Sequence, residues 1–256
     1  MRVRAVIAYD GTRYHGFQRQ APEREPTIQG EVERALGQIV AQPALVLGAG
    51  RTDAGVHASG QVIAFDVEWR HGISDLQRAL NANLPDDIVV WNAAEAVAGF
   101  HPRYQAHSRE YRYTIYNAIV RHPLHRLYAL HIPDPLNVSA MRAAAQKLIG
   151  EHDFAAFGQP TVGQATVRLM YRAEVNAEPP WVTIDLEANG FLYRMVRSLV
   201  GTLIEVGRGR LTLDRFAEVL GSRDRSQAET TAAPHGLCLT RVNYGVGPVV
   251  NLPAEE

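Results

Sequence analysis

Cysteine and lysine are almost absent from this chain of 256 residues. Its one cysteine, Cys238, excludes an internal disulfide and any zinc site built on a cysteine cluster. The sequence has no apolar run close to the roughly 20 residues that a membrane-spanning helix needs, and its start, MRVRAVIAYD, lacks the apolar core of a signal peptide. We therefore expect a cytoplasmic protein with no membrane partner, long enough for one large domain or two modest ones.

Charge of one sign is also missing, because the formal net charge is −1. This value argues against a wholly basic nucleic-acid-binding protein. Of the 26 basic residues, however, all but Lys147 are Arg. A GC-rich genome explains this preference as well as a functional need does, since the planar guanidinium suits phosphate contacts and base stacking.

Basic and aromatic residues are interleaved between residues 101 and 126. A nucleic-acid-binding surface requires charge for phosphates and flat faces for bases, so this density indicates contact with nucleic acid. The segment holds four His, four Tyr and one acid, Glu110, together with Arg103, Arg109, Arg112, Arg121 and Arg126.

Apolar residues recur with the periods of both strands and helices. The mixture predicts an α+β fold in which helices pack on one face of a sheet. Strands are expected at 3–9, 61–67, 87–91, 111–115, 165–176, 181–188 and 236–244, and helices at 28–40 behind a Thr27 cap, 74–82, 138–149, 191–206 and 212–221.

The strand at 181–188 alternates most clearly. Its pattern predicts a sheet with one buried and one polar face, and an open polar face is a natural platform for RNA. We expect Val182, Ile184, Leu186 and Ala188 to be buried, and Thr183, Asp185, Glu187 and Asn189 to form the polar face.

The helix at 191–206 carries arginines at helical spacing. At 100° per residue, the basic positions share one face and the apolar positions lie opposite, toward the core. The basic face comprises Arg194, Arg197, Gly201 and Arg208, and the apolar face Leu192, Val196, Leu199 and Leu203.

Several catalytic motifs are absent. The segment Gly48–Asp53 begins like a dinucleotide fingerprint, but Asp53 stands where the third glycine belongs. The chain has no Gly-Lys-Ser/Thr phosphate loop and no Gly-x-Ser-x-Gly nucleophile elbow. His122, His125 and His131 lie around prolines without paired ligand spacing, which favours solvated or RNA-facing side chains over a metal site.

The glycine-rich loop 48–60 is the most prominent polar segment. It carries one carboxylate, Asp53, between Arg51 and His57, and its glycines allow the backbone to approach a ligand closely. The residues alone leave two interpretations open. Asp53 is either the acceptor of an Asx turn or a group with a chemical role.

GRTDAGVHASGQV, residues 50–62, resembles the catalytic loop of the tRNA pseudouridine synthase A family. The resemblance continues in order along nearly the whole chain, with Phe17 at a position where some members have Trp. The other similar segments are YDGTRYHGFQRQ (9–20), TIQGEVERAL (27–36), NANLP (81–85), FHPRYQAHSREYRYTIYN (100–117), FLYRMVRSLVGTLIEVGRGR (191–210) and HGLCLTRVNY (235–244).

This resemblance implies the pseudouridine synthase fold, in which two similar α/β halves with mostly antiparallel sheets join across a central RNA-binding cleft. The halves are expected at 1–104 and 105–256, with a link near 99–105. The implied activity is isomerisation of uridine to pseudouridine at positions 38 to 40 in the anticodon stem-loop of tRNA. No cofactor or metal is implied, because the reaction is an internal rearrangement, and the family acts as a homodimer.

The resemblance also implies a role for each site residue. Asp53 matches the catalytic aspartate, which attacks the sugar, attacks the base or abstracts a proton. Arg51 is expected to stack into the space that an extruded nucleotide leaves. Tyr111 is expected to stack on the target base, Arg197 to pair with Asp53, and Leu237 to line the pocket. Taken without the resemblance, Tyr111 and Leu237 also fit an ordinary core, and Arg197 a solvated helix face.

Two other functions are compatible with parts of the sequence. A tRNA-binding protein without catalysis would use the same Arg and Tyr residues, but the intact loop around Asp53 argues against it. A metal-dependent RNA-cleaving hydrolase would normally need further carboxylates near Asp53, and none lies within ten residues of it. Loss of activity in EDTA would favour that hydrolase.

Overall fold

The computed structural model describes residues 1–40, 42–160, 163–228 and 231–245. The chain divides into two compact units: Met1–His107 with the described residues from Leu239 onward, and Ser108–Cys238. The predicted division at 104 and 105 does not include this return of the chain to the first unit. Among the described residues, no helix has the length and apolar content needed to cross a bilayer.

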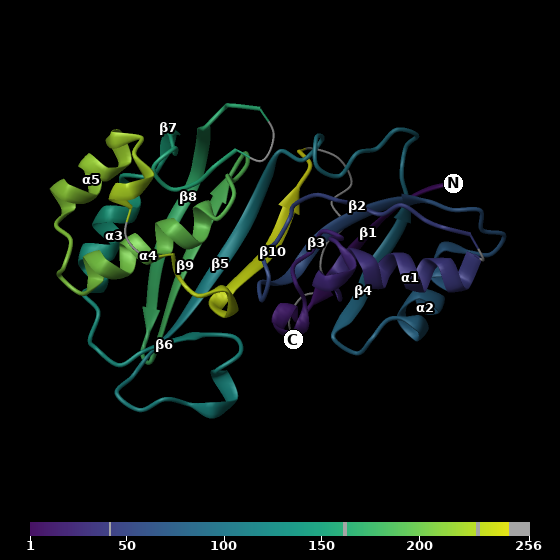
Figure 1. Cartoon of the computed structure of the whole chain (residues 1–256), viewed down its shortest axis with the longest axis horizontal. Helices are drawn as coiled ribbons and strands as arrows, with labels where there is room; N and C mark the ends of the chain where they lie inside the picture. Colours follow the sequence, from purple (N-terminus) through teal and green to yellow (C-terminus); the bar gives the residue numbers. More distant parts are fainter. Residues whose placement is uncertain (41, 161–162, 229–230, 246–256) are drawn as a thin grey trace. The chain divides into compact units, whose positions relative to one another are not determined.

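The sheet of the first unit has the strand order β4–β1–β3–β10. β1 (Arg2–Tyr9) pairs antiparallel with β3 (His57–Asp66) on one side and with β4 (Ile88–Glu95) on the other, while β2 (Leu47–Gly48) pairs with β3 and β10 (Leu237–Asn243) lies beside β3 (Figure 1). Strand β3 begins before the predicted start at Gln61. The glycine-rich loop is therefore shorter than expected and spans residues 49–56.

Two helices complete the first unit. α1 (Ile28–Val40) packs against α2 (Ile73–Asn83), and α2 packs against β4. The predicted cap of α1 is confirmed, because the Thr27 hydroxyl oxygen accepts a hydrogen bond from the Gly30 amide at 3.3 Å. The apolar faces of the helices are fully buried through Ile28, Val32, Leu36, Leu76 and Leu80.

The second unit is built on an antiparallel sheet with the order β5–β9–β8–β7. Its strands are β5 (Ser108–Asn117), β7 (Gly150–Asp153), β8 (Val167–Glu178) and β9 (Trp181–Ala188), and β6 (Leu130–Ile132) pairs parallel with β5. α3 (Val138–Gln146) packs on β8 and on α4 (Met195–Gly207), and α5 (Leu213–Ser222) packs on β7 and α3. The prediction of an α+β fold with mostly antiparallel sheets is confirmed.

The polar face of β9 differs from the open surface predicted. The apolar alternation is confirmed, but Asp185 is only 4% exposed. Arg112, directly opposite on β5, donates from Nε to Asp185 Oδ1 at 2.8 Å, and Arg172 on β8 donates to Glu110 at 2.8 Å. Because carboxylates neutralise these arginines, the face does not offer the positive charge that RNA attracts.

Helix α4 also differs from its predicted two-sided pattern. It begins at Met195, so Leu192 and Arg194 precede it, and Arg194 caps it with a left-handed backbone at φ 62°. The supposed basic face is buried at Gly201, as are the other residues of the helix except Arg197. The predicted burial of Leu192, Val196, Leu199 and Leu203 is confirmed, and of the predicted basic face only Gly201 is buried.

Candidate active site

Asp53 lies on loop 49–56, between β2 and β3 of the first unit. The Val56 amide donates to the Asp53 carbonyl oxygen at 3.1 Å and closes a turn through Ala54 and Gly55. Gly55 has a φ of 76°, a left-handed conformation that glycine adopts without a steric penalty. The turn presents the half-buried carboxylate at its first position.

The segment of residues 9–17 holds this loop on both sides of the carboxylate. The Phe17 amide donates to the Thr52 carbonyl oxygen at 3.0 Å, and the Gly55 amide donates to the Tyr14 carbonyl oxygen at 3.3 Å. The hydroxyl oxygens of Tyr9 and Thr52 lie 2.8 Å apart in a buried hydrogen bond. The backbone before and after the carboxylate is thus positioned by a segment remote in sequence.

Two glycines permit this close approach. A Cβ on Gly11 would lie 2.0 Å from the Val56 carbonyl oxygen, which is shorter than any real contact. A Cβ on Gly16 would lie 2.8 Å from the Thr52 carbonyl oxygen, and the φ of Gly16 is 102°. A side chain at either position would push the two segments apart.

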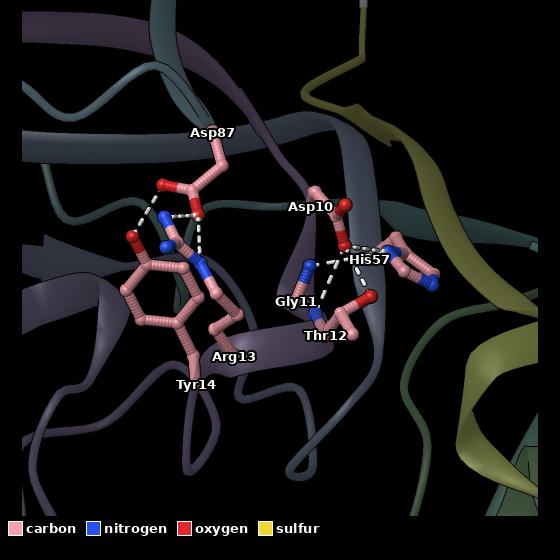
Figure 2. A network of polar contacts seen from close by, with 7 residues as sticks. All are labelled: Asp10, Gly11, Thr12, Arg13, Tyr14, His57 and Asp87. Carbon is pink, nitrogen blue, oxygen red and sulfur yellow. Dashed lines mark hydrogen bonds and ion pairs between the residues drawn. The ribbon is translucent and has the colours of Figure 1, made fainter. Parts of the chain in front are cut away.

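His57 supports the loop from the start of β3 (Figure 2). Its Nδ1 accepts from the Gly11 amide at 3.1 Å and lies 3.1 Å from Asp10 Oδ1. The same Asp10 oxygen accepts from the Thr12 amide at 2.9 Å and from its hydroxyl at 2.6 Å. The ring is buried and engaged with residues 10–12, so its contacts are those of a structural residue.

Asp87 anchors the other side of the same segment (Figure 2). Arg13 donates to Asp87 Oδ2 from Nη2 at 2.6 Å and from Nε at 3.0 Å, and the Tyr14 hydroxyl donates to Oδ1 at 2.5 Å. Burial, followed by the hydrogen bond to Asp87, raises the pKa of Tyr14 well above its ordinary value. Tyr14 therefore stays a donor at any physiological pH.

Arg51 stands two residues before Asp53 and is exposed. Partial burial of its guanidinium, and then the positive charge of Arg103, lower the pKa of Arg51, while Tyr104 acts in the opposite direction. Arg51, Arg103 and Tyr104 therefore lie within electrostatic reach of one another in the first unit.

The remaining predicted site residues belong to the second unit. Tyr111 on β5 is 8% exposed, and its ring meets that of Phe191 edge to face, with centroids 5.2 Å apart and planes at 86°. Tyr113, two residues on, shares the buried face and donates from its hydroxyl to the Ala233 carbonyl oxygen at 2.8 Å. Both tyrosines are thus well ordered by packing.

Arg197 and Leu237 lie close to Tyr113 in this unit. Arg197 Nε donates to the Ala232 carbonyl oxygen at 2.8 Å, and the Ala232 amide donates back to the Arg197 carbonyl oxygen at 3.0 Å. Leu237 is 5% exposed and follows Gly236, where a Cβ would meet the Tyr113 ring at 2.8 Å. The structure thus groups Arg51 with Asp53 in one unit, and Tyr111, Arg197 and Leu237 in the other.

The arginines at 101–126 are divided between the two units, and two of them are held by contacts within the second unit. Arg109 is 9% exposed and donates to the Asn189 carbonyl oxygen at 3.0 Å, and Arg112 pairs with Asp185. Arg103 belongs to the first unit and the other four to the second. Contact with nucleic acid therefore stays a prediction for single arginines rather than for the whole segment.

The three histidines considered as metal ligands pack against one another and against the ring of Tyr116. The rings of His122 and His125 lie 4.2 Å apart, and those of His125 and His131 lie 5.8 and 6.1 Å from Tyr116. Within the described part of the chain, no three His, Cys, Asp or Glu side chains are grouped as a metal site.

Comparison with known proteins identifies the family. The family model described as tRNA pseudouridine synthase matches residues 5–105 and 144–245. The chain belongs to this family. It is therefore an isomerase, with the pseudouridine synthase fold, as the resemblance implied.

Curated members of the family are similar over most of their length. The tRNA pseudouridine synthase A of Chloroflexus aurantiacus is 47% identical over 94% of this chain and 88% of that protein. The proteins of the same name from Moorella thermoacetica and Geobacter sulfurreducens are 44% and 42% identical, each over 94% of this chain and 99% of its own length. The solved Cbf5-Nop10-Gar1 complex aligns at 14% identity with a TM-score of 0.35, over 93% of this chain and 58% of that chain.

The matched segments include most of the predicted site. Asp53 and Arg51 lie in the first segment, and Arg197 and Leu237 in the second, whereas Tyr111 lies outside both. Sequence reasoning overlooked the side chains that hold the loop, among them Tyr9 and Thr52. The glycines at 11 and 16 are the sequence signal that residues 9–17 approach the backbone of the Asp53 loop closely.

Proposed function

We propose that this enzyme isomerises uridine to pseudouridine at positions 38, 39 and 40 in the anticodon stem-loop of tRNA. In this reaction the bond between N1 and the sugar C1′ breaks and a bond between C5 and C1′ forms. The proton on C5 is lost and N1 gains a proton. Atoms and electrons balance within the nucleotide, so the reaction consumes no redox cofactor.

One observation carries the proposal: the Asp53 carboxylate is presented at the first position of a turn whose flanking backbone is tied to residues 14 and 17. Such positioning suits a carboxylate that acts as a nucleophile or a base, because catalysis depends on accurate placement. An Asx-turn acceptor would not need a second segment to hold it. We assign Asp53 as the catalytic residue.

The other residues are proposed to bind the substrate. Tyr111 offers a ring that stacks on the target base, and Leu237 an apolar side chain beside it. Arg197 is proposed to keep the carboxylate of Asp53 ionised. Arg51, exposed two residues before Asp53, is proposed to occupy the space that the extruded nucleotide vacates.

We further propose that the substrate is tRNA and that the enzyme acts as a cytoplasmic homodimer. The names of the curated relatives support the substrate. Light scattering on the purified protein tests the dimer, with a single monomeric mass as the contrary result.

The decisive test compares Asp53→Asn with the wild type on an unmodified tRNA transcript. Pseudouridines are mapped by carbodiimide-blocked primer extension, and formation is timed under single-turnover conditions. The amide keeps the size of the side chain and its capacity for an Asx turn but cannot act as a nucleophile. We expect pseudouridine formation to fall below detection while tRNA binding persists.

Asp75→Asn is the matched control, because Asp75 is a carboxylate of the same unit that pairs with Arg78 on α2. It should modify tRNA at the wild-type rate. A folded Asp53→Asn protein that still forms pseudouridine would remove Asp53 from the chemistry. Wild-type modification that disappears in EDTA would favour a metal-dependent reaction instead.

A further inference from the structure

The turn of residues 101–105 in the first unit is held by three hydrogen bonds. The Gln105 amide donates to the His101 carbonyl oxygen at 3.2 Å, and the Arg103 amide donates to His101 Nδ1 at 3.2 Å. The Tyr244 hydroxyl donates to the Pro102 carbonyl oxygen at 2.8 Å. The turn is therefore a fixed support for the side chains that it carries.

These side chains place two aromatic rings beside a positive charge. Tyr104 is 74% exposed, although its ring is large and apolar. The ring of His101 lies 4.2 Å from that of Tyr104, and the Arg103 guanidinium lies 5.9 Å from the centroid of the Tyr104 ring. An exposed aromatic ring beside Arg is the combination that binds single-stranded nucleic acid.

The turn lies within electrostatic reach of the loop that carries Asp53. Burial, and then the positive charge of Arg103, lower the pKa of Arg51, which precedes Asp53 by two residues.

We propose that the 101–105 turn is a second RNA-binding element, in which Arg103 binds a backbone phosphate and Tyr104 stacks on an unpaired base. The inference rests on the proposed function and extends it to the nucleotides that flank the target uridine. A phosphate fits Arg103 because the planar guanidinium pairs with its oxygens at two points. An unpaired base fits Tyr104, because a ring exposed to this extent is open to stacking on its free face.

The first test measures how the affinity for an unmodified tRNA transcript depends on salt, between about 50 and about 200 mM. Arg103→Gln should weaken binding about tenfold and reduce the slope of log K against log salt by ~0.7–0.9, the loss of one phosphate contact. Arg78→Gln removes an exposed charge of the same unit that already pairs with Asp75, and should leave the slope unchanged. Equal slopes for the two variants would overturn the phosphate contact.

The second test concerns the exposed ring. Tyr104→Ala should weaken tRNA binding by ~5- to 150-fold, whereas Tyr104→Phe should bind like the wild type, since stacking needs only the ring. The single-turnover rate at saturating tRNA should change by less than about twofold in both, because the turn binds and does not react. Wild-type affinity in Tyr104→Ala would overturn the stacking contact.

The outcomes separate this inference from the proposed function. If the wild type forms no pseudouridine on the transcript, the proposed function fails. If it forms pseudouridine and both Arg103→Gln and Tyr104→Ala bind normally, only the second RNA-binding element fails. Thermal melting confirms folding, and the Tyr104 pair decides the question by itself if Arg103→Gln does not fold.

Discussion

The hydrogen bond between Tyr9 and Thr52 joins the first strand to the residue before Asp53, and its removal tests whether that tether positions the active site. Both side chains are buried, at 4% and 6% exposure, and their hydroxyl oxygens lie 2.8 Å apart. Tyr9→Phe deletes one hydroxyl with almost no change of shape. It leaves the buried Thr52 hydroxyl without this partner.

The expected magnitude follows from that burial. A satisfied hydrogen bond contributes about 0.5–1.5 kcal/mol, whereas a buried group that loses its partner costs about 1–3 kcal/mol. Tyr9→Phe and Thr52→Val should each lower the melting temperature by about 2–4 °C for each kcal/mol lost. In the double variant neither hydroxyl is orphaned, so the two losses should fall short of additivity by about 1 kcal/mol.

The assay is a double-mutant cycle with urea unfolding and single-turnover pseudouridine formation. Displacement of the Asp53 turn by a fraction of an ångström should slow the reaction of Tyr9→Phe by about tenfold or more, because misplacement by 1 Å costs up to ~100-fold. If the free energies of unfolding lost in the two single variants add up to the loss in the double variant within ~0.3–0.5 kcal/mol, the hydrogen bond between Tyr9 and Thr52 contributes nothing to stability. Wild-type rates in both single variants would refute the positioning role.

Three further predictions concern other parts of the fold. Gly11→Ala should abolish pseudouridine formation, because its Cβ would lie 2.0 Å from the Val56 carbonyl oxygen. The control, Gly221→Ala on α5, has open space around it and should react like the wild type. Equal rates for the two variants would show that the close approach of residue 11 to the loop is not needed. Tyr111→Phe should keep its tRNA affinity while Tyr111→Ala loses ~1–3 kcal/mol of stacking in filter binding, and equal single-turnover rates for the wild type and Tyr111→Ala would remove the ring from the site. Burial and neighbouring positive charges hold the pKa of His101 below 6.5. The His101 ring therefore binds a proton more readily in the unfolded chain than in the folded one, and the free energy of unfolding should fall as the pH drops below about 6.5. Urea midpoints from about pH 8 to about pH 5.5 should show the fall, and His101→Gln should reduce it; an unchanged difference would contradict the assignment.

The local pattern of side chains was sufficient for several parts of this protein. A helix capped by Thr27 and the alternation of β9 are set by neighbours within a few residues, so period and capping predicted both. The family could likewise be inferred from sequence, since the loop around Asp53 is one continuous run of residues. The α+β class followed from the order of such segments.

Only the tertiary structure decided which polar residues are buried, because their partners are remote in sequence. Asp185 is buried beside Arg112, 73 positions away, and Gly201 is buried although helical spacing places it with the arginines of α4. His57 is held by Gly11, 46 positions away, a contact that the sequence around Asp53 does not reveal. A periodic pattern records only which face of an element is apolar, whereas burial of a polar group depends on which charge or amide the fold brings to it. That is why the sequence by itself determined most of the elements and the glycine-rich loop around Asp53, and only the folded chain decided which polar residues support that loop.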